Sequence, residues 1–300
     1  MNELQSEFSV SQRRACRAVG QPRQTQRYQR KVRDDEPALI EDILKLVGEF
    51  PRYGYRLICG KLRQLGWTIN PKRVYRIWKQ EGLKVPMKKR KKRRLGNSDN
   101  SAQRAAAEHP NHVWSWDFVF DRTASGKQLK WLVIIDEFTR ENLCLEVGYG
   151  FKSEDVIDRL VEISSERGLP KFIRSDNGPE FIAEALRKWL VKLDVGTLYI
   201  EPGSPWQNAF VESFNSRFRD EFLSLEVFDN SAAAQRLTNH WRTNYNNHRP
   251  HSSLGYITPS EFARQCSASV ANAPSTEHCR KDQENLAEFN QPVLLSLIHI

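Results

Sequence analysis

The stretch Trp114-Ser115-Trp116-Asp117-Phe118-Val119-Phe120-Asp121 decides the fold of this chain. Aromatic side chains occupy every second position and alternate with smaller or acidic ones, which is the period of a β-strand with one face in a core. Apolar runs at 131–135 and 143–147 predict two more strands close behind it. Together these segments predict a three-stranded meander.

Helical and strand patterns alternate after the meander. Helices are predicted over 153–167, 179–193, 205–222 and 232–246, and short strands at 172–173 and 197–200. The order βββαβαβα is typical of an α/β fold in which a mixed sheet is flanked by helices.

An all-α region precedes the sheet. Helices are predicted over 37–48 and 55–65, and Asn70-Pro71 starts a third, because Asn is a good N-cap and Pro suits the first helical position. In the third helix the buried face is expected to hold Val74, Ile77 and Trp78, which follow the spacing i, i+3, i+4. These helices predict a helix-turn-helix domain.

Basic residues occupy the outer arc of that third helix, namely Lys72, Arg73, Arg76 and Lys79. A basic outer face on the last helix of a trihelical unit suits a recognition helix that enters a DNA groove. The alternative is a plain three-helix bundle with a solvated face. We favour DNA contact, because the catalytic interpretation below requires a module that docks on DNA.

Positive charge is concentrated in the N-terminal third of the chain. Residues 1–110 hold 26 Lys and Arg against 11 Asp and Glu, whereas residues 111–300 hold 20 against 26, and the net charge is +9. A basic half joined to a mildly acidic half indicates a DNA-binding region ahead of a catalytic one; the alternative is a solvated basic surface. The densest basic cluster can lie along phosphates and comprises Lys84, Lys88, Lys89, Arg90, Lys91, Lys92, Arg93 and Arg94.

Composition excludes several classes of protein. Of the 300 residues, 39 % are hydrophobic, which suffices for a core, yet there is no apolar run of about 18 residues, so no membrane span is expected. The first residues lack the pattern of a secretory signal, so we expect a cytoplasmic, nucleoid-associated protein. Five scattered cysteines without Cys-x-x-Cys predict neither a disulfide framework nor a zinc site.

Three acidic residues lie in distinctive sequence motifs. Asp117 lies in the first predicted strand, Asp176 in Arg174-Ser175-Asp176-Asn177-Gly178-Pro179-Glu180-Phe181, and Glu212 in Pro205-Trp206-Gln207-Asn208-Ala209-Phe210-Val211-Glu212-Ser213-Phe214-Asn215. Three such side chains can hold two Mg²⁺ ions, about 3.5–4 Å apart, that clamp the attacking and leaving oxygens of a phosphodiester. The sequence therefore predicts metal-dependent phosphodiester chemistry, with Mn²⁺ as a substitute for Mg²⁺.

Residues 111–262 resemble the integrase core of bacterial insertion-sequence transposases, of the kind encoded by the second reading frame (OrfB) of two-frame elements. The phrases around Asp117, Asp176 and Glu212 match the family's Asp-Asp-(35)-Glu triad, and Arg219 matches its basic residue seven positions after the glutamate. The segment Asn247-His248-Arg249-Pro250-His251-Ser252-Ser253-Leu254-Gly255-Tyr256 matches its C-terminal phrase.

This resemblance implies a ribonuclease-H-like fold, similar to retroviral integrase. It implies a DDE-type transposase that cleaves DNA and transfers strands. It also implies partners: DNA at the element ends and at the target, the upstream-frame (OrfA) product or a fusion with it, and further copies of the chain on paired ends.

The helix that carries Glu212 has two predicted faces. At about 100° per residue, one side is shared by Glu212, Asn208, Asn215, Ser216 and Arg219, and the far side by Phe210, Phe214 and Phe218, with Val211 and Phe222 beside them. We expect the apolar stripe to dock on the sheet, so that Glu212 faces the metals and Arg219 faces a phosphate.

Other polar residues have two interpretations each. Candidates for contact with DNA ends are Trp206, Gln207 and Asn208, although Trp206 can equally anchor the core. Contact with DNA and fixing of their own loop are equally open for His248, Arg249 and His251. Asp136 follows a predicted strand and is expected to cap a turn rather than hold a metal.

The leading interpretation is a transposase. Its rivals are a metal-dependent nuclease without strand transfer, which would not need the basic N-terminal region, and a non-catalytic DNA-binding regulator, which would not need the triad. The chain is predicted to divide into a basic leader with a short helix-turn-helix or a frayed chain (1–34), a helix-turn-helix domain (35–83), a basic linker (84–109), an integrase core (110–265) and a disordered tail (266–300). We interpret the last residues, 295–300, as an artefact, because they equal one reading frame of a sequencing-library adapter.

Overall fold

The computed structural model describes residues 2–28, 33–85, 106–175, 184–199 and 208–271. The chain divides into two compact units between Lys45 and Leu46. Several sequence expectations fall outside the described residues, namely those on Asp176, Trp206, Gln207 and the basic cluster 88–94.

Three short helices begin the first unit: α1 (Asn2–Glu7), α2 (Gln12–Ala18) and α3 (Arg23–Arg27). The side chain of Ser11 caps α2 by accepting a hydrogen bond from the Arg14 amide. Helix α3 ends at Arg27, because Tyr28 adopts extended backbone. The next helix, α4 (Glu36–Glu49), spans the division between the two units.

In the second unit α5 (Tyr55–Gln64) packs against α6 (Pro71–Gln80). The side chain of Asn70 accepts from the Lys72 amide at 2.8 Å and so caps α6, with Pro71 in the first turn. The predicted inward residues Val74, Ile77 and Trp78 are all buried. The predicted helix start and buried face are therefore confirmed.

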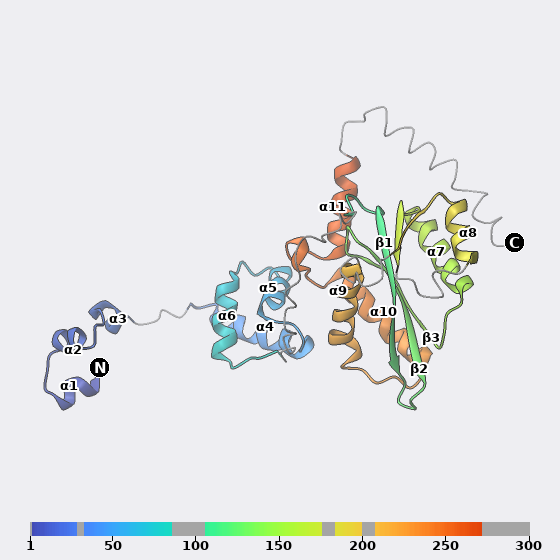
Figure 1. Ribbon diagram of the computed structural model, residues 1–300. Helices are drawn as coiled ribbons and strands as arrows, with labels where there is room; N and C mark the ends of the chain where they lie inside the picture. The colour runs from blue at the N-terminus through green and yellow to red at the C-terminus, as the bar shows by residue number, and fades with distance from the viewer. Residues whose placement is uncertain (1, 29–32, 86–105, 176–183, 200–207, 272–300) are drawn as a thin grey trace, which may run out of the picture. The chain divides into compact units, whose positions relative to one another are not determined.

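A five-stranded mixed sheet forms the centre of the second unit (Figure 1). Its strands are β1 (Val113–Arg122), β2 (Gln128–Asp136), β3 (Asn142–Gly148), β4 (Phe172–Ser175) and β5 (Gly196–Tyr199). In space they lie in the order β3-β2-β1-β4-β5, in which β1 to β3 form the predicted antiparallel meander while β4 and β5 run parallel to β1.

Helices cover both faces of this sheet, as the α/β prediction requires. Helices α7 (Ser153–Arg167) and α8 (Glu184–Lys192) pack on the face of β1 that holds Trp114, Trp116 and Phe118. Helices α9 (Ala209–Phe218) and α10 (Ser231–Asn247) pack on the opposite face, around Val119 of β1 and Trp131 of β2. Figure 1 shows the two helix pairs on opposite sides of the strands.

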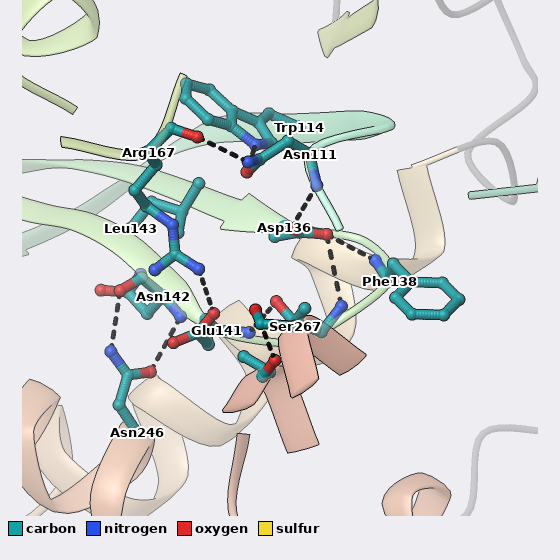
Figure 2. A network of polar contacts seen from close by, with 12 residues as sticks. Asn111, Trp114, Asp136, Phe138, Glu141, Asn142, Leu143, Arg167, Asn246 and Ser267 are labelled. Atoms are coloured by element: carbon teal, nitrogen blue, oxygen red, sulfur yellow. Dashed lines mark hydrogen bonds and ion pairs between the residues drawn. The ribbon is translucent and has the colours of Figure 1, made fainter. Parts of the chain in front are cut away.

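The turn after β2 is built around Asp136, which is fully buried (Figure 2). Its Oδ2 accepts from the Asn111 amide at 2.9 Å, and its Oδ1 accepts from the Phe138 amide at 2.7 Å and the Thr139 amide at 3.3 Å. Burial raises the pKa of Asp136, against the effect of these three donors. The prediction that Asp136 caps a turn is confirmed.

The end of the described chain departs from the prediction. Helix α11 (Pro259–Ala271) continues beyond residue 265, so disorder from residue 266 is wrong for 266–271. The amide of Glu261 donates to the Thr258 hydroxyl at 3.2 Å, and Pro259 occupies the first turn, so this segment carries its own helix start. None of the helices in the described ranges is long and apolar enough to cross a membrane.

Candidate active site

Asp117 lies in the middle of the central strand β1 and is half-buried. Because side chains alternate along a strand, Asp117 shares the α9-facing side of the sheet with Val119. Its Oδ1 accepts a hydrogen bond from the Phe118 amide at 2.7 Å, and its Oδ2 accepts one from the side-chain amide of Asn215 at 2.7 Å. The second bond connects the strand to α9.

Asn215 stands on α9 three residues after Glu212 and is 1 % exposed. Residues three apart on a helix are surface neighbours, so the contact of Asn215 with Asp117 brings Glu212 to the same region. The structure thus places the helix that carries Glu212 against the strand that carries Asp117, and Glu212 itself is solvent-exposed.

The third predicted carboxylate, Asp176, follows directly after the end of β4 at Ser175. Although Asp176 is outside the described residues, the strand before it is placed: Arg174 pairs with Ser115 in the parallel register of β1 and β4. Ser115 precedes Asp117 by two residues, and Arg174 precedes Asp176 by two. The strand that carries Asp117 and the strand that ends one residue before Asp176 are therefore neighbours in the sheet.

A buried ion pair lies between these two strands. The carboxylate of Glu137, 1 % exposed, accepts from Arg174 Nε at 2.9 Å and also from the Ser115 hydroxyl. Its second oxygen is buried and has no hydrogen-bond partner among the described residues. Glu137 follows β2, so one carboxylate from a third strand end holds β1 and β4 together just before the predicted aspartates.

The rotation of α9 follows the prediction in part: Phe214 and Phe218 are buried, and Asn215, predicted on the side of Glu212, contacts Asp117. Asn208 and Asn215, predicted on the side of Glu212 away from the apolar stripe, are both buried, whereas Phe210 is only half-buried and lies against the Arg140 guanidinium. Val211, expected at the edge of the stripe, is fully buried. Glu212, Ser216 and Arg219, which were predicted to share one side of the helix, are all exposed. The buried side of α9 is therefore centred nearer to Val211 than predicted, because Val211, Phe214 and Phe218 fill the space over β1 and β2.

The predicted basic face of α6 is largely open. Lys72, Arg76 and Lys79 are exposed, and Arg73 is half-buried. Tyr75 stands among them, 42 % exposed, with the Lys79 ammonium 5.2 Å from its ring centroid. Its ring packs on that of Tyr55 with 4.8 Å between the centroids. The surface is therefore aromatic as well as basic, which suits stacking on nucleic acid beside phosphate contacts.

Sequence reasoning missed several of these contacts. The exposure of Tyr75 could have been predicted, since an aromatic residue between Lys72 and Lys79 falls on the outer side of the helix. A buried ion pair at Arg174 could have been suspected, because a charged residue in a buried strand needs a partner. The partner of Arg174, Glu137, could not have been predicted, because its contacts come from segments far away in sequence.

The donor set at Asp117 fits a divalent cation of the Mg²⁺ class. Such cations prefer carboxylate oxygens and waters, and the region offers two carboxylates and the buried Oδ1 of Asn215, which has no hydrogen-bond partner among the described residues. Within the described ranges no three metal-ligating side chains gather at one point, and the predicted third ligand, Asp176, is not among them.

Known families match most of this chain. Residues 33–91 match an HTH-like domain, and residues 107–205 and 193–259 each match an integrase core domain. These matches cover the helices α5 and α6, the sheet, and the helix that carries Glu212.

Two curated relatives are similar over most of their length. An uncharacterised 31.7 kDa protein of insertion element IS407 from Burkholderia multivorans is 38 % identical over 92 % of this chain, and 98 % of that relative is covered. Transposase InsD of insertion element IS2 from Escherichia coli is 30 % identical over 77 % of this chain, and 80 % of it is covered.

Solved structures with a similar arrangement include retroviral proteins. The catalytic core domain of HTLV-2 integrase in complex with magnesium covers 52 % of this chain and 97 % of its own, at 16 % identity and a TM-score of 0.40. An intasome of simian T-cell lymphotropic virus in complex with a PP2A regulatory subunit covers 74 % of each chain, at 15 % identity and a TM-score of 0.44.

Proposed function

Because this chain belongs to the insertion-element transposases with an integrase core domain, we propose that it cuts and joins DNA at element ends through Asp117, Asp176 and Glu212. The observation that carries this proposal is the 2.7 Å hydrogen bond from Asn215 to Asp117. It joins the strand of one predicted catalytic carboxylate to the helix of another. A half-buried carboxylate in a central strand, beside an exposed one on a helix, is the arrangement such a reaction needs.

The three carboxylates would hold two Mg²⁺ ions, which Mn²⁺ can replace. When bound, these ions lower the pKa of an attacking water or hydroxyl and neutralise charge on the phosphate oxygens. Asp117 is prepared for this role, because the Phe118 amide and the Asn215 side chain fix the direction of its carboxylate. Glu212 is exposed and can move to meet the ligand.

Two successive reactions at phosphorus account for strand cleavage and strand transfer. In the first, water attacks the phosphodiester at the element end, the bond to the 3′ oxygen breaks, and a 3′-hydroxyl is left. In the second, this hydroxyl attacks a phosphodiester of the target, so one phosphorus–oxygen bond forms as another breaks. The second reaction needs no ATP, because the number of phosphodiesters is unchanged.

Other residues of the chain bind and position the DNA. The exposed basic side chains Lys72, Arg76 and Lys79 on α6 suit the phosphates or base edges of the terminal sequence. Exposed Arg219, at the end of α9, suits a phosphate near the cut bond. The basic cluster 88–94 would add contacts without sequence preference.

The proposal extends to partners. We expect the chain to act with the upstream-frame (OrfA) product or as a fusion with it, and to assemble in several copies on paired ends. We place it in the cytoplasm, at the nucleoid, where its DNA substrates are.

A strand-transfer assay with and without Mg²⁺ separates this proposal from its rivals. A transposase yields nicked ends and joined products, a plain nuclease yields only cleavage, and a regulator yields binding alone. Asp117→Asn, Asp176→Asn and Glu212→Gln should abolish both products and preserve DNA binding, because each amide keeps the shape of the side chain but not its charge. Asp121→Asn, at the outer end of β1, is the matched control. Wild-type turnover in all three triad variants would refute the assignment.

A further inference from the structure

Arg249 lies in the C-terminal motif 247–256, for which the sequence left DNA contact and a structural role equally open, and it is buried in the protein. It is 4 % exposed and donates two hydrogen bonds to the carboxylate of Glu221, from Nε to Oε2 at 2.7 Å and from Nη2 to Oε1 at 2.5 Å. A bidentate pair of this kind fixes the relative position and orientation of the two groups. Since both side chains are almost out of water, the pair orders the interior rather than a DNA contact.

Glu221 belongs to the last turns of the helix that carries Glu212. Helix α9 passes without a break into the π-helical turn η3 (Arg219–Leu223). In such turns each backbone hydrogen bond spans one residue more than in the α-helix, and they are frequent at functional sites. The pair with Arg249 therefore anchors the far end of the catalytic helix.

The segment before α5 packs on the same place. The ring of Tyr53, 5 % exposed, lies 5.6 Å from the guanidinium carbon of Arg249. Burial, followed by the charge of Glu221, raises the pKa of Tyr53. Arg52 donates to the Ser224 hydroxyl at 3.2 Å and lies 3.9 Å from the Asp220 carboxylate. Residues 52 and 53 thus contact side chains in and beside η3.

Helix α5 contacts the C-terminal motif 247–256 at Gly60. A Cβ at this position would lie 2.8 Å from Cβ of Pro250 and 2.9 Å from its Cγ. Distances this short cannot be accommodated without movement of one backbone or the other, since the proline ring is rigid. Gly60 is therefore required for the close approach of the helix to the loop.

We propose that Tyr53 and Gly60, seated against Glu221, Arg249 and Pro250, form a docking surface that holds the DNA-reading helices α5 and α6 in fixed register with the catalytic helix α9. Arg249 is its positioning residue, because it contacts both Glu221 and Tyr53. The distance along DNA between the sequence read by α6 and the bond that is cut is then set by this contact. The proposal rests on the proposed function for its DNA substrate, but the contact itself does not depend on catalysis.

The test uses three variants of the full chain. Gly60→Ala adds one methyl group at the tightest point, and Arg52→Ala removes the interactions with Ser224 and Asp220 from a side chain that is partly solvent-exposed. Gly48→Ala is the matched control, because nothing lies within 4 Å of a Cβ added there. If Gly60→Ala fails to fold, Arg52→Ala still tests the surface.

The first measurement needs no catalysis. Hydrogen–deuterium exchange should become faster in peptides that cover η3 and α5 in Gly60→Ala and Arg52→Ala, and stay unchanged in Gly48→Ala. Peptides of β1 and β2 should exchange at the wild-type rate in all three. Unchanged exchange at η3 in both test variants would overturn the docking surface, whether or not the protein cleaves DNA.

The second measurement uses end DNA in which one to four base pairs are inserted between the terminal sequence and the cut site. The wild type should lose cleavage by about 10²-fold on these substrates, because misplacement of the bond by ångströms has this effect. Gly60→Ala and Arg52→Ala should bind uncut ends as tightly as the wild type yet show a flattened dependence on spacing. A wild-type dependence in both would contradict the proposal, and absence of all cleavage in the wild type would count against the proposed function instead, with the exchange measurement still deciding the docking surface.

Discussion

The side-chain amide of Asn215 donates a hydrogen bond of 2.7 Å to Oδ2 of Asp117. One partner lies at the centre of β1 and the other is almost fully buried on α9, three residues after Glu212. Since Oδ1 of Asp117 already accepts from the Phe118 amide, the two donors together fix the plane of the carboxylate. This contact leads to the first prediction.

Asn215→Ala should raise the Mg²⁺ concentration needed for half-maximal cleavage, because the Asp117 carboxylate loses the donor that fixes its direction. Loss of this hydrogen bond to a half-buried carboxylate should also lower the stability by about 1–3 kcal/mol. The measurements are a Mg²⁺ titration of cleavage and a calorimetric titration with Mn²⁺. Ser213→Ala, on the exposed side of α9, is the control. Equal metal dependence in Asn215→Ala and wild type would contradict this role.

Phe214→Ala should destabilise the fold by about 3–5 kcal/mol, the usual range for a buried phenylalanine. The Phe214 ring is 2 % exposed and lies edge-on to Tyr245 at 4.9 Å and to Trp241 at 5.7 Å. Arg219→Ala should do the reverse: because Arg219 is exposed, its melting temperature should stay near wild type while cleavage of end DNA falls. Melting curves and end cleavage for both variants check this, and an unfolded Arg219→Ala would refute the placement of that side chain.

Glu137→Gln should destabilise the protein, because buried Arg174 loses the charged carboxylate of its ion pair with Glu137, and the loss of one partner of a buried pair costs about 3–5 kcal/mol. The double variant Glu137→Met/Arg174→Met should restore most of this stability, since a buried pair can often be replaced by apolar side chains. It should nevertheless cleave poorly, because β1 and β4 lose the carboxylate that links them before the predicted aspartates.

The control for this pair is Glu141→Met/Arg167→Met, a second ion pair, with a buried glutamate and a partly exposed arginine, at the turn in Figure 2. It lies at the start of β3 and the end of α7, on strands and helices that carry no predicted catalytic residue. If both double variants lose cleavage to the same degree, Glu137 has no specific role at the site. Chemical denaturation and a cleavage assay on the same samples provide the comparison.

Stability should fall as the pH decreases from about 6.5 towards about 3 because of His251. Burial, followed by the positive charges of Arg249, Arg217 and Arg140, lowers the pKa of His251 to about 3. Below about pH 6.5 the unfolded imidazole binds a proton that the folded one does not bind until about pH 3. The unfolded state therefore gains protons first, and stability decreases as the pH falls, by at most about 1.4 kcal/mol per pH unit.

Urea unfolding at several pH values checks this expectation. His251→Asn should reduce the slope of stability against pH, whereas His240→Asn, at an exposed position of α10, should leave it unchanged. An equal slope in wild type and His251→Asn would show that the histidine does not contribute. The Ser253 hydroxyl, 2.9 Å from His251 Nδ1, can pair with the introduced amide and limit the damage to the loop.

Simultaneous replacement of Lys72, Arg76 and Lys79 by alanine should weaken binding to terminal-repeat DNA and reduce its salt dependence. For each DNA phosphate that these side chains no longer neutralise, the slope of log affinity against log salt should fall by about 0.9. Lys192→Ala, exposed on α8, is the control. Fluorescence anisotropy at a series of salt concentrations checks the prediction, and an unchanged slope would assign the basic face of α6 another purpose.

The local sequence determined most of the secondary structure. The alternation from Trp114 to Asp121 predicted β1, the Asn70-Pro71 pair predicted the start of α6, and the periodic segment from Ser153 to Arg167 predicted α7 with its observed bounds. Strand periods, caps and helix repeats depend on neighbouring residues, so they can be read from the chain alone. The same holds for the resemblance of the carboxylate phrases, which rests on residue type and spacing.

Only the tertiary structure decided which polar residues are buried and what they contact. The burial of Asn208 and Asn215 and the partial exposure of Phe210 were not predicted, because the inward arc of α9 depends on the space left above β1 and β2 rather than on a count of its apolar residues. Glu137 pairs with Arg174, which is 37 residues away in sequence, and Arg249 pairs with Glu221, which is 28 residues away. The energy that keeps a charge buried comes from its partner, and that partner becomes a neighbour only when the chain has folded.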